Sequence, residues 1–413
     1  MVSGADSRMA APMSARRSSL TIIFTTVFVD LLGFGIVLPL LPYYAHQLQA
    51  SGLTVGMLIA VYSAMQFLAA PWWGRLSDRI GRRPVLLVSL AGSTLSYLLF
   101  AVADTIGLLF VSRILAGLGG ANISVAQAFI ADTTSEQERA RGMGMIGAAF
   151  GLGFVFGPAI GGLLAHYGHA APGFAATVIC GLNFIAALFR LPESLPPERR
   201  QVRRATHPLA QLREAFRRPH LRLPLLIFTA VVFSFATMET TLPLLGAKRF
   251  HLSASQIYWL FGYLGVMTTV VQGGLIGRLT PRVGEPHLVV VGTVLLAVGL
   301  GAAPFSPPVV LLLLALGAIA VGQGICSPVL SSLISKSSGA HEQGGVLGVS
   351  QSAGSLARIL GPIWGGVIFD CAGPAGPYVT TACLMLAAVA VALSLAHRAN
   401  VAAQSSPELT PSV

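Results

Sequence analysis

Residues 74–84 read Gly-Arg-Leu-Ser-Asp-Arg-Ile-Gly-Arg-Arg-Pro, and residues 277–284 read Gly-Arg-Leu-Thr-Pro-Arg-Val-Gly. Five residues of the first stretch recur in the second at an offset of 203: Gly74, Arg75, Leu76, Arg79 and Gly81. Each copy is a short charged segment between two long apolar runs. A charged turn between membrane spans, present once in each half, indicates two homologous halves, which is a common design of transporters.

The composition is that of a membrane protein. Hydrophobic residues make up 54% of the 413 residues and charged residues 10%, whereas soluble domains carry about 25% charged residues. A membrane span needs about 20 apolar residues, so the apolar runs predict an all-α transmembrane fold of twelve helices. The predicted spans are 20–44, 55–74, 84–103, 106–130, 143–165, 173–191, 223–247, 256–277, 287–303, 308–333, 345–369 and 376–397.

The net charge of +11 indicates membrane topology rather than nucleic-acid binding, because of where the basic residues lie. With the N-terminus inside, 22 of the 26 Lys and Arg residues fall on the cytoplasmic side, nine of them between Arg190 and Arg222. An excess of basic residues marks the cytoplasmic loops of membrane proteins. We therefore expect both termini in the cytoplasm, and a basic linker that touches anionic lipid and binds no nucleic acid.

The repeat continues at two further places, both at an offset of 204. Residues 38–41 recur at 242–245 as Leu-Pro-Leu-Leu, and the Gly-Pro pair at 157–158 recurs at 361–362. Matches at three places predict two parallel six-helix halves, related by an axis along the membrane normal. The predicted parts are an N-terminal tail (1–19), a first six-helix bundle (20–191), a basic linker (192–222), a second bundle (223–397) and a C-terminal tail (398–413).

The chain carries no pattern typical of catalysis, nucleotide hydrolysis or metal binding. Its four cysteines lack the spacing of a metal site, and no glycine-rich loop ends in Lys-Ser or Lys-Thr. We expect a protein that is not an enzyme and that holds no cofactor and no metal ion.

Several motifs resemble those of the major facilitator superfamily. The segment 74–84 resembles the signature loop between helices 2 and 3, and its candidate gating residues are Gly74, Asp78, Arg79, Gly81, Arg82 and Arg83. A second motif, in predicted helix 5, resembles one typical of antiporters in that superfamily: Gly153, Gly157, Pro158, Gly161 and Gly162. Arg113 lies in a segment that resembles the helix 4 motif, and Asp30 in one that resembles helix 1 of twelve-span drug/proton antiporters. The resemblance implies the twelve-helix fold of the superfamily and favours antiport.

Residues 77–87, 130–134 and 147–162 resemble tetracycline/proton antiporters most strongly, and the chain departs from these proteins where their specificity lies. Ser96 stands where tetracycline pumps usually carry an acidic residue in helix 3. Predicted helix 8 has no histidine and helix 9 has no charge, whereas those pumps carry a His and an Asp there. Glu239 is not part of their pattern. Tetracycline is therefore one candidate substrate among others.

Four charged side chains lie deep in the predicted spans: Asp30, Arg113, Glu239 and Arg358. Burying an ionisable group in a bilayer is costly, so such groups are commonly functional. Counted at about 1.5 Å per residue, Asp30 and Arg113 lie at depths that a long arginine side chain can bridge, and so do Glu239 and Arg358. We predict one acid–base pair in each half.

Such a pair suits proton coupling. Burial disfavours the charged form of a carboxyl group and a nearby arginine favours it, so the acid can bind a proton and release the arginine. Asp30 is the first candidate proton carrier and Glu239 the second. The alternative for each pair is a static contact that fixes helix packing.

Gating and the substrate path can be predicted as well. We expect Asp78 to reach the start of helix 11 near residues 344–345, where the helix dipole favours an anion, and to hold the cytoplasmic side closed; the alternative is a solvated turn.

The glycines of helix 5 permit close helix packing. The resemblance implies a pore lined by helices 1, 4, 7 and 10. Candidates for the substrate cavity, which can equally serve in ordinary helix–helix hydrogen bonds, are Asn122, Gln127, Tyr62, Gln66, Thr237 and Gln323.

These observations together predict a proton-coupled efflux transporter of hydrophobic or amphipathic compounds. We expect a monomer in the inner membrane of a bacterium, with small-molecule substrate, protons and the lipid bilayer as partners. A lipid, sugar or metabolite carrier of the same fold is the alternative among transporters. A membrane sensor without transport activity is the alternative of another class, although it would gain little from the buried charges.

Overall fold

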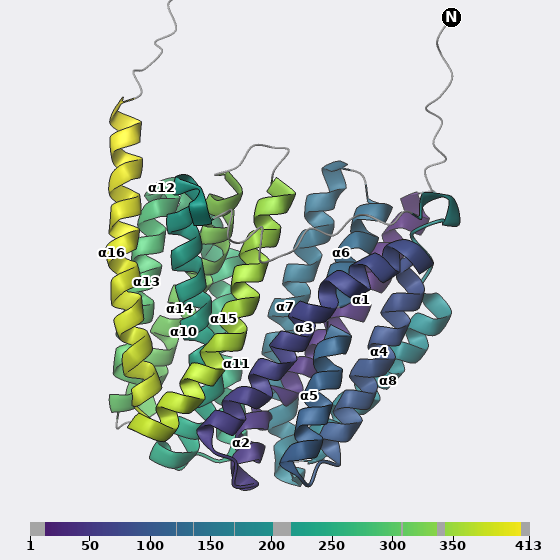
Figure 1. Ribbon diagram of the computed structural model, residues 1–413, viewed down its shortest axis with the longest axis horizontal. Helices are drawn as coiled ribbons and strands as arrows, with labels where there is room; N and C mark the ends of the chain where they lie inside the picture. The colour runs from purple at the N-terminus through teal and green to yellow at the C-terminus, as the bar shows by residue number, and fades with distance from the viewer. Residues whose placement is uncertain are drawn as a thin grey trace, which may run out of the picture.

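The computed structural model describes residues 13–120, 122–134, 136–168, 170–200, 216–306, 309–336 and 343–405, and it confirms the all-helical fold (Figure 1). The first group of helices comprises α1 (Met13–Val37), α2 (Leu40–Gln47), α3 (Gly52–Ile80), α4 (Arg82–Ala101), α5 (Ile106–Gly120), α6 (Asn122–Thr133), α7 (Glu136–Leu164) and α8 (Ala170–Arg190). The second group comprises α10 (Pro219–Phe250), α11 (Ala254–Val270), α12 (Ile276–Val283), α13 (Glu285–Ala302), α14 (Val309–Lys336), α15 (Gln343–Ala372) and α16 (Gly376–Ser405). Short segments of other helix types follow four of these helices: η1 (Ala165–Tyr167), η2 (Pro197–Arg199), η3 (Val271–Leu275) and η4 (Ala303–Phe305).

The described helices account for the predicted spans. Eleven segments are long and apolar enough to cross a membrane, and a shorter apolar one, Gly151–Tyr167, belongs to the fifth predicted span. Three spans are each built from a pair of helices: α1 with α2, α5 with α6, and α11 with α12. The shortest predicted span, 287–303, corresponds to Glu285–Phe305.

Gly81 and Gly284, which match each other in the two charged turns, are glycines for a conformational reason. Gly81 has φ 108° and Gly284 has φ 82°, and each joins two helices, α3 to α4 and α12 to α13. Side chains strongly disfavour these positive φ angles, and glycine adopts them readily. The recurrence of glycine at an offset of 203 therefore follows from the same sharp helix–helix turn in both halves.

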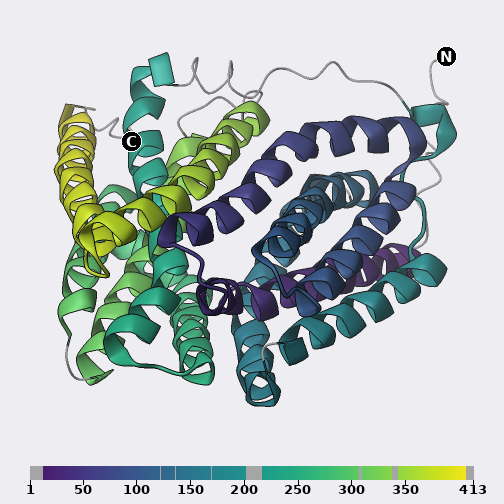
Figure 2. The same cartoon turned by 60° about the horizontal axis from the view of Figure 1, so that its bottom comes forward.

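Figure 1 shows α1 to α8 on one side of the molecule and α10 to α16 on the other. Helix α1 begins and α16 ends at the top of this view, which we call the termini end; we call the opposite end the α2 end. The two groups meet where α3 packs on α15 and where α7 packs on α11. In Figures 1 and 2, α3 and α15 meet at the α2 end and diverge toward the termini end.

The two contacts between the groups, α3 with α15 and α7 with α11, are related to each other by the internal repeat. On one side, a Cβ atom at Gly366 of α15 would overlap the backbone of Gly52 at the start of α3. On the other side, Ser255 at the start of α11 donates a hydrogen bond of 3.3 Å to the carbonyl of Gly162 in α7. Ser255 follows Gly52 by 203 residues and Gly366 follows Gly162 by 204, so the two contacts are repeats of one another.

The helices at the junction differ in their regularity. Helix α3 runs from Gly52 to Ile80 as one α-helix with Pro71 inside it. The matching span of the second group contains a π-helical turn, η3, between α11 and α12. This wide turn includes Gly273 and Gly274, and both have open space where a side chain would begin. Prolines also lie inside other long helices: Pro158 in α7, Pro224 and Pro243 in α10, Pro328 in α14 and Pro362 in α15.

Candidate functional site

Four side chains from four helices form a polar cluster in the first group: Asp30 of α1, Tyr62 of α3, Tyr97 of α4 and Arg113 of α5. Asp30 is 8% exposed and Arg113 is 3% exposed. Tyr62 and Tyr97 each lie within electrostatic range of both Asp30 and Arg113. The structure therefore brings the predicted acid and base of the first half into one cluster, together with two tyrosine side chains.

Arg113 is only partly satisfied by its neighbours. Its Nε donates a hydrogen bond of 3.3 Å to Oγ of Ser112, and its Cζ lies 5.5 Å from the centre of the Phe100 ring, in a cation–π contact. Its Nη2 is buried and has no hydrogen-bond partner among the described residues. A buried donor without a partner costs free energy, so this nitrogen is suited to bind a substrate acceptor or a carboxylate that moves toward it.

The second group supplies one acid and one base. Glu239 of α10 and Arg358 of α15 lie within electrostatic range of each other. Nη2 of Arg358 donates a hydrogen bond of 3.4 Å to Oγ of Ser355, one turn away on α15. Arg358 also lies within electrostatic range of Tyr62, which belongs to the first group. In the described part of the chain, Tyr62 therefore lies near charged groups of both halves.

Tyr62 and Gln66 lie one turn apart on α3 and contact two other helices of the first group. The Tyr62 ring packs on Phe34 of α1, with 5.2 Å between the ring centres. Nε2 of Gln66 donates a hydrogen bond of 2.8 Å to the carbonyl of Gly120, the last residue of α5. The last carbonyls of a helix have no partner within it, so Gln66 completes the end of α5.

The other cavity candidates lie in different surroundings. Thr237 is 1% exposed, and its hydroxyl donates a hydrogen bond of 3.0 Å to the carbonyl of Gly361 on α15. Gln323 of α14 has a buried Oε1 without a partner among the described residues, whereas Gln127 is exposed on α6. The side chain of Asn122 lies outside the described part of the chain.

The glycines of the helix 5 motif make two different close contacts. Gly153 and Gly157 face α1, where an added Cβ atom would meet backbone atoms. Gly161 and Gly162 face the ring of Tyr258 on α11, across the junction between the groups. The motif therefore packs α7 within its own group with one pair of glycines and against the other group with the next pair.

Arg82 is the centre of the first charged turn. Its Nη1 lies 2.6 Å from Oδ1 of Asp78, and its Nε lies 3.0 Å from Oδ2 of Asp132 at the end of α6. Nη1 also donates a hydrogen bond of 2.6 Å to Oγ of Ser77. Asp78 is thus paired within its own turn. Its predicted contact with the start of α15, whose first side chains lie outside the described part, stays a prediction.

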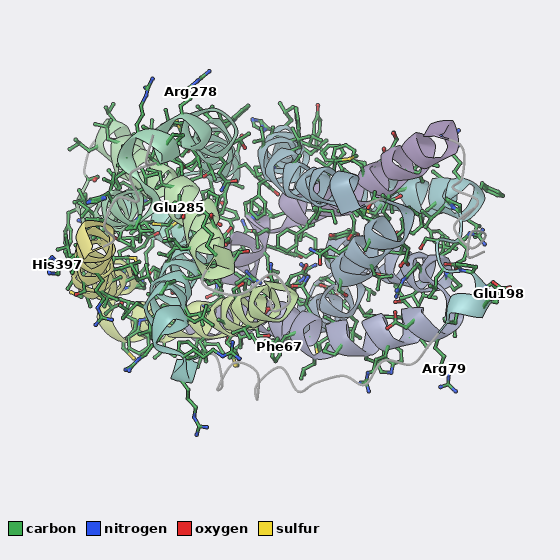
Figure 3. All side chains as sticks on the ribbon, turned by 90° about the horizontal axis from the view of Figure 1, so that it is seen from above. Phe67, Arg79, Glu198, Arg278, Glu285 and His397 are labelled. Atoms are coloured by element: carbon green, nitrogen blue, oxygen red, sulfur yellow. The ribbon has the colours of Figure 1, made fainter. Side chains whose placement is uncertain are left out.

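The other residues of the turn surround this pair. The backbone N–H groups of Arg82 and Arg83 donate hydrogen bonds of 2.8 and 3.2 Å to the carboxylate of Glu193, which follows α8. Nη2 of Arg83 donates a hydrogen bond of 2.7 Å to the carbonyl of Leu188. Gly74 has open space around its Cα. Figure 3 shows Arg79 on the opposite side of the molecule from Arg278 of the second copy.

Sequence reasoning missed three acidic residues that the structure places at helix ends: Asp132, Glu193 and Asp370. Glu193 binds the start of α4 from 111 residues away. Oδ1 and Oδ2 of Asp370 accept hydrogen bonds from the backbone N–H groups at the start of α3, more than 300 residues away. The sequence showed only that each of these acids lies just beyond a predicted span. Its spacing did not indicate which helix the carboxylate would bind.

The chain was also compared with known proteins. A family model described as the Major Facilitator Superfamily matches residues 23–285 and 268–411. The tetracycline resistance protein of class C from Escherichia coli is 35% identical over 356 residues, which cover 84% of this chain and 88% of that protein. Multidrug resistance protein 2 from Bacillus subtilis is 29% identical over 370 residues, covering 88% and 91%. The crystal structure of the human organic anion transporter MFSD10 (TETRAN) is 27% identical, with a TM-score of 0.68 over 91% of this chain and 99% of that one.

Proposed function

The chain belongs to the major facilitator superfamily of membrane transporters, and we propose that it exports hydrophobic or amphipathic compounds in exchange for protons. The proposed mechanism is alternating access, in which the two groups of helices rock about a central site. The protein acts as a monomer in the cytoplasmic membrane of a bacterium, with both termini in the cytoplasm. Tetracycline-like drugs are candidate substrates, since relatives at 30–35% identity are named tetracycline resistance proteins.

The observation that carries this proposal is the position of Tyr62. This side chain lies on a helix that crosses the junction, and it is within electrostatic range of Asp30, Arg113 and Arg358. A change in the charge of Asp30 therefore acts on Tyr62 directly, and a change in the charge of Glu239 acts on Arg358, which in turn faces Tyr62. Proton binding at a carboxyl group next to an arginine frees the arginine, and the freed guanidinium group and the aromatic rings beside it can then exchange partners as the groups rock.

Asp30 is the proposed main proton carrier and Glu239 the proposed second carrier. Arg113 and Arg358 are the bases that each carboxylate pairs with when it has lost its proton. Phe34, which packs on Tyr62, supplies an apolar ring next to this polar cluster, and that combination suits a large amphipathic substrate.

The test is substrate-driven proton movement in inside-out membrane vesicles, followed with a pH-sensitive dye. The panel holds tetracyclines, fluoroquinolones, cationic dyes, lipids and organic anions, the last because a solved relative is named an organic anion transporter. We expect at least one drug to release protons from vesicles with the wild-type protein and not from vesicles with Asp30→Asn.

The matched control is Asp104→Asn, which neutralises an exposed acid outside the cluster and is expected to behave as wild type. Proton movement that persists unchanged in Asp30→Asn would remove Asp30 from the mechanism. A folded wild-type protein that moves protons with none of the drugs, but transports a lipid or metabolite, would replace drug export with the alternative carrier function.

A further inference from the structure

Asp370, near the end of α15, binds the start of α3 with both carboxylate oxygens. Oδ1 accepts a hydrogen bond of 2.7 Å from the backbone N–H of Gly52, and Oδ2 accepts one of 2.8 Å from the N–H of Leu53. The first N–H groups of a helix have no partner within it and carry a partial positive charge. A carboxylate with two such bonds is therefore a strong cap, and here it comes from the other group of helices.

The neighbouring backbone makes this cap possible. A Cβ atom at Gly52 would lie 2.7 Å from Oδ1 of Asp370 and 2.8 Å from the carbonyl oxygen of Gly366. One turn further along α3, a Cβ atom at Gly56 would overlap the carbonyl of Pro362. Glycines at both positions let α3 approach α15 closely enough for the carboxylate to reach the helix start. The cap and the close approach exist only while the two helices are together at the α2 end.

At the repeat-related junction between α7 and α11, the described residues include no such carboxylate. The residue that matches Asp370 in the first half, 204 positions earlier, is His166. The start of α11 is capped from within its own helix, since Oγ of Ser253 accepts from the N–H of Gln256 and Oε1 of Gln256 accepts from the N–H of Ser253. Near the start of α11, the hydrogen bonds to the first group come from neutral hydroxyl groups, that of Ser255 to α7 and that of Tyr258 to α1.

We infer that Asp370 is a latch that holds the α2 end of the transporter closed. The inference rests on the alternating-access mechanism proposed above. Separating α3 from α15 breaks both hydrogen bonds and removes the carboxylate from the helix dipole, so the latch stabilises the state described here over the state that is open at the α2 end. Because no charged cap crosses the α7–α11 junction in the described part of the chain, the two junctions separate unequally, and the one at α3 and α15 sets the balance.

The experiment measures the conformational balance directly, without substrate and without a proton gradient. Spin labels are attached to cysteines that replace Gly107 of α5 and Phe305 of η4, two exposed positions of different groups near the α2 end. A second pair, at Glu198 and Arg278, reports on the termini end, where Figure 3 shows the two residues on opposite sides. The four native cysteines are first replaced, and the distance distributions are recorded by double electron–electron resonance in lipid nanodiscs.

In Asp370→Ala we expect the ratio of α2-open to α2-closed molecules to rise about fivefold, the size expected for a carboxylate at a helix N-terminus. The Glu198–Arg278 distances shift in the opposite sense. Asp370→Asn, which keeps one acceptor oxygen, lies between Asp370→Ala and the wild type, and Asp370→Glu restores most of the closed population.

The matched control is Ser51→Ala. Ser51 caps the same start of α3, by accepting a 3.1 Å hydrogen bond from the N–H of Thr54, but it lies within its own group of helices. This variant weakens the helix start in both conformations alike, so its distance distributions stay those of the wild type. A distribution in folded Asp370→Ala that equals the wild type, or a shift in Ser51→Ala as large as in Asp370→Ala, would overturn the latch.

The outcome does not depend on what is transported. If the vesicle assay finds no drug-driven proton movement while the spin labels respond to Asp370→Ala, the latch stands and the export proposal fails. If drugs move protons and the labels ignore Asp370→Ala, the export proposal stands and the latch is rejected.

Discussion

The hydroxyl group of Tyr258, on α11, donates a hydrogen bond of 2.9 Å to the backbone carbonyl of Ile36, on α1. Ile36 lies in the last turn of α1, which ends at Val37 before Pro39, so its carbonyl has lost its usual helical donor. The Tyr258 ring lies at the same time against Gly161 and Gly162 of α7. One side chain of the second group therefore contacts two helices of the first group at the α2 end.

Tyr258→Phe is expected to lower the stability of the protein by about 1–3 kcal/mol, because the buried carbonyl of Ile36 loses its donor. The phenylalanine ring keeps the contact with Gly161. Thermal unfolding in detergent measures the effect. Tyr263→Phe removes a hydroxyl group from the same helix and serves as control. Equal melting temperatures of Tyr258→Phe and wild type would show that the hydrogen bond contributes nothing.

Gly157→Ala is expected to prevent normal folding, whereas Gly151→Ala should be tolerated. An added Cβ atom at Gly157 would lie 2.6 Å from backbone atoms of Gly35, and overpacking of this kind costs about 1–3 kcal/mol or more. At Gly151 the nearest atom would be Oγ1 of Thr269 at 3.6 Å, an ordinary contact. The yield of monodisperse protein and its melting temperature test the pair. Similar losses for both variants would contradict the assignment of the close α1–α7 contact to Gly157.

Glu193→Gln is expected to destabilise the protein by about 1 kcal/mol, since the carboxylate that caps the start of α4 loses its charge. The nearby Glu198→Gln changes an exposed side chain in the same segment and should leave the melting temperature unchanged. The comparison of the two variants by thermal unfolding checks this. A loss of the same size for Glu198→Gln would attribute the effect to net charge instead of the cap.

The Glu239–Arg358 pair is expected to be strongly non-additive. Removing one partner with Arg358→Gln or Glu239→Gln leaves the other charge buried without compensation, which costs about 3–5 kcal/mol. The double variant removes both charges and should be more stable than Arg358→Gln alone. Melting temperatures of the four proteins form the cycle. Additive losses would mean that the two side chains do not interact, and the proposed proton site of the second half would be withdrawn.

Much of the fold could be predicted from local sequence. The apolar runs located the spans because a bilayer sets their length, and the recurring Gly81 and Gly284 marked two turns because a positive φ angle restricts the residue type. Counting depth along the helices placed Asp30 and Arg113 at levels that a long arginine side chain can bridge. These signals need no knowledge of which helices are neighbours.

The contacts between distant segments could not be predicted in the same way. A count of residues gives the depth of Thr237 but not its direction, and the structure turns it toward Gly361. Asp370 reaches α3 only because Gly56 and Gly366 let two backbones come close. Such contacts depend on how helices from both halves pack, which a single sequence read along its length does not reveal.

The π-helical turn between α11 and α12 has a geometric consequence for the duplicated segments. In α3, Gly74 follows Gly52 by 22 positions of continuous helix, and Gly277 follows Ser255 by the same number of positions. A π turn holds about one residue more than an α-helical turn, so everything beyond it is rotated by roughly 100° about the helix axis. The two charged turns therefore differ in their rotation about the axes of the helices that carry them. This rotation predicts that Arg75 and its counterpart Arg278, which occupy matching positions in the sequence, leave their helices in different directions.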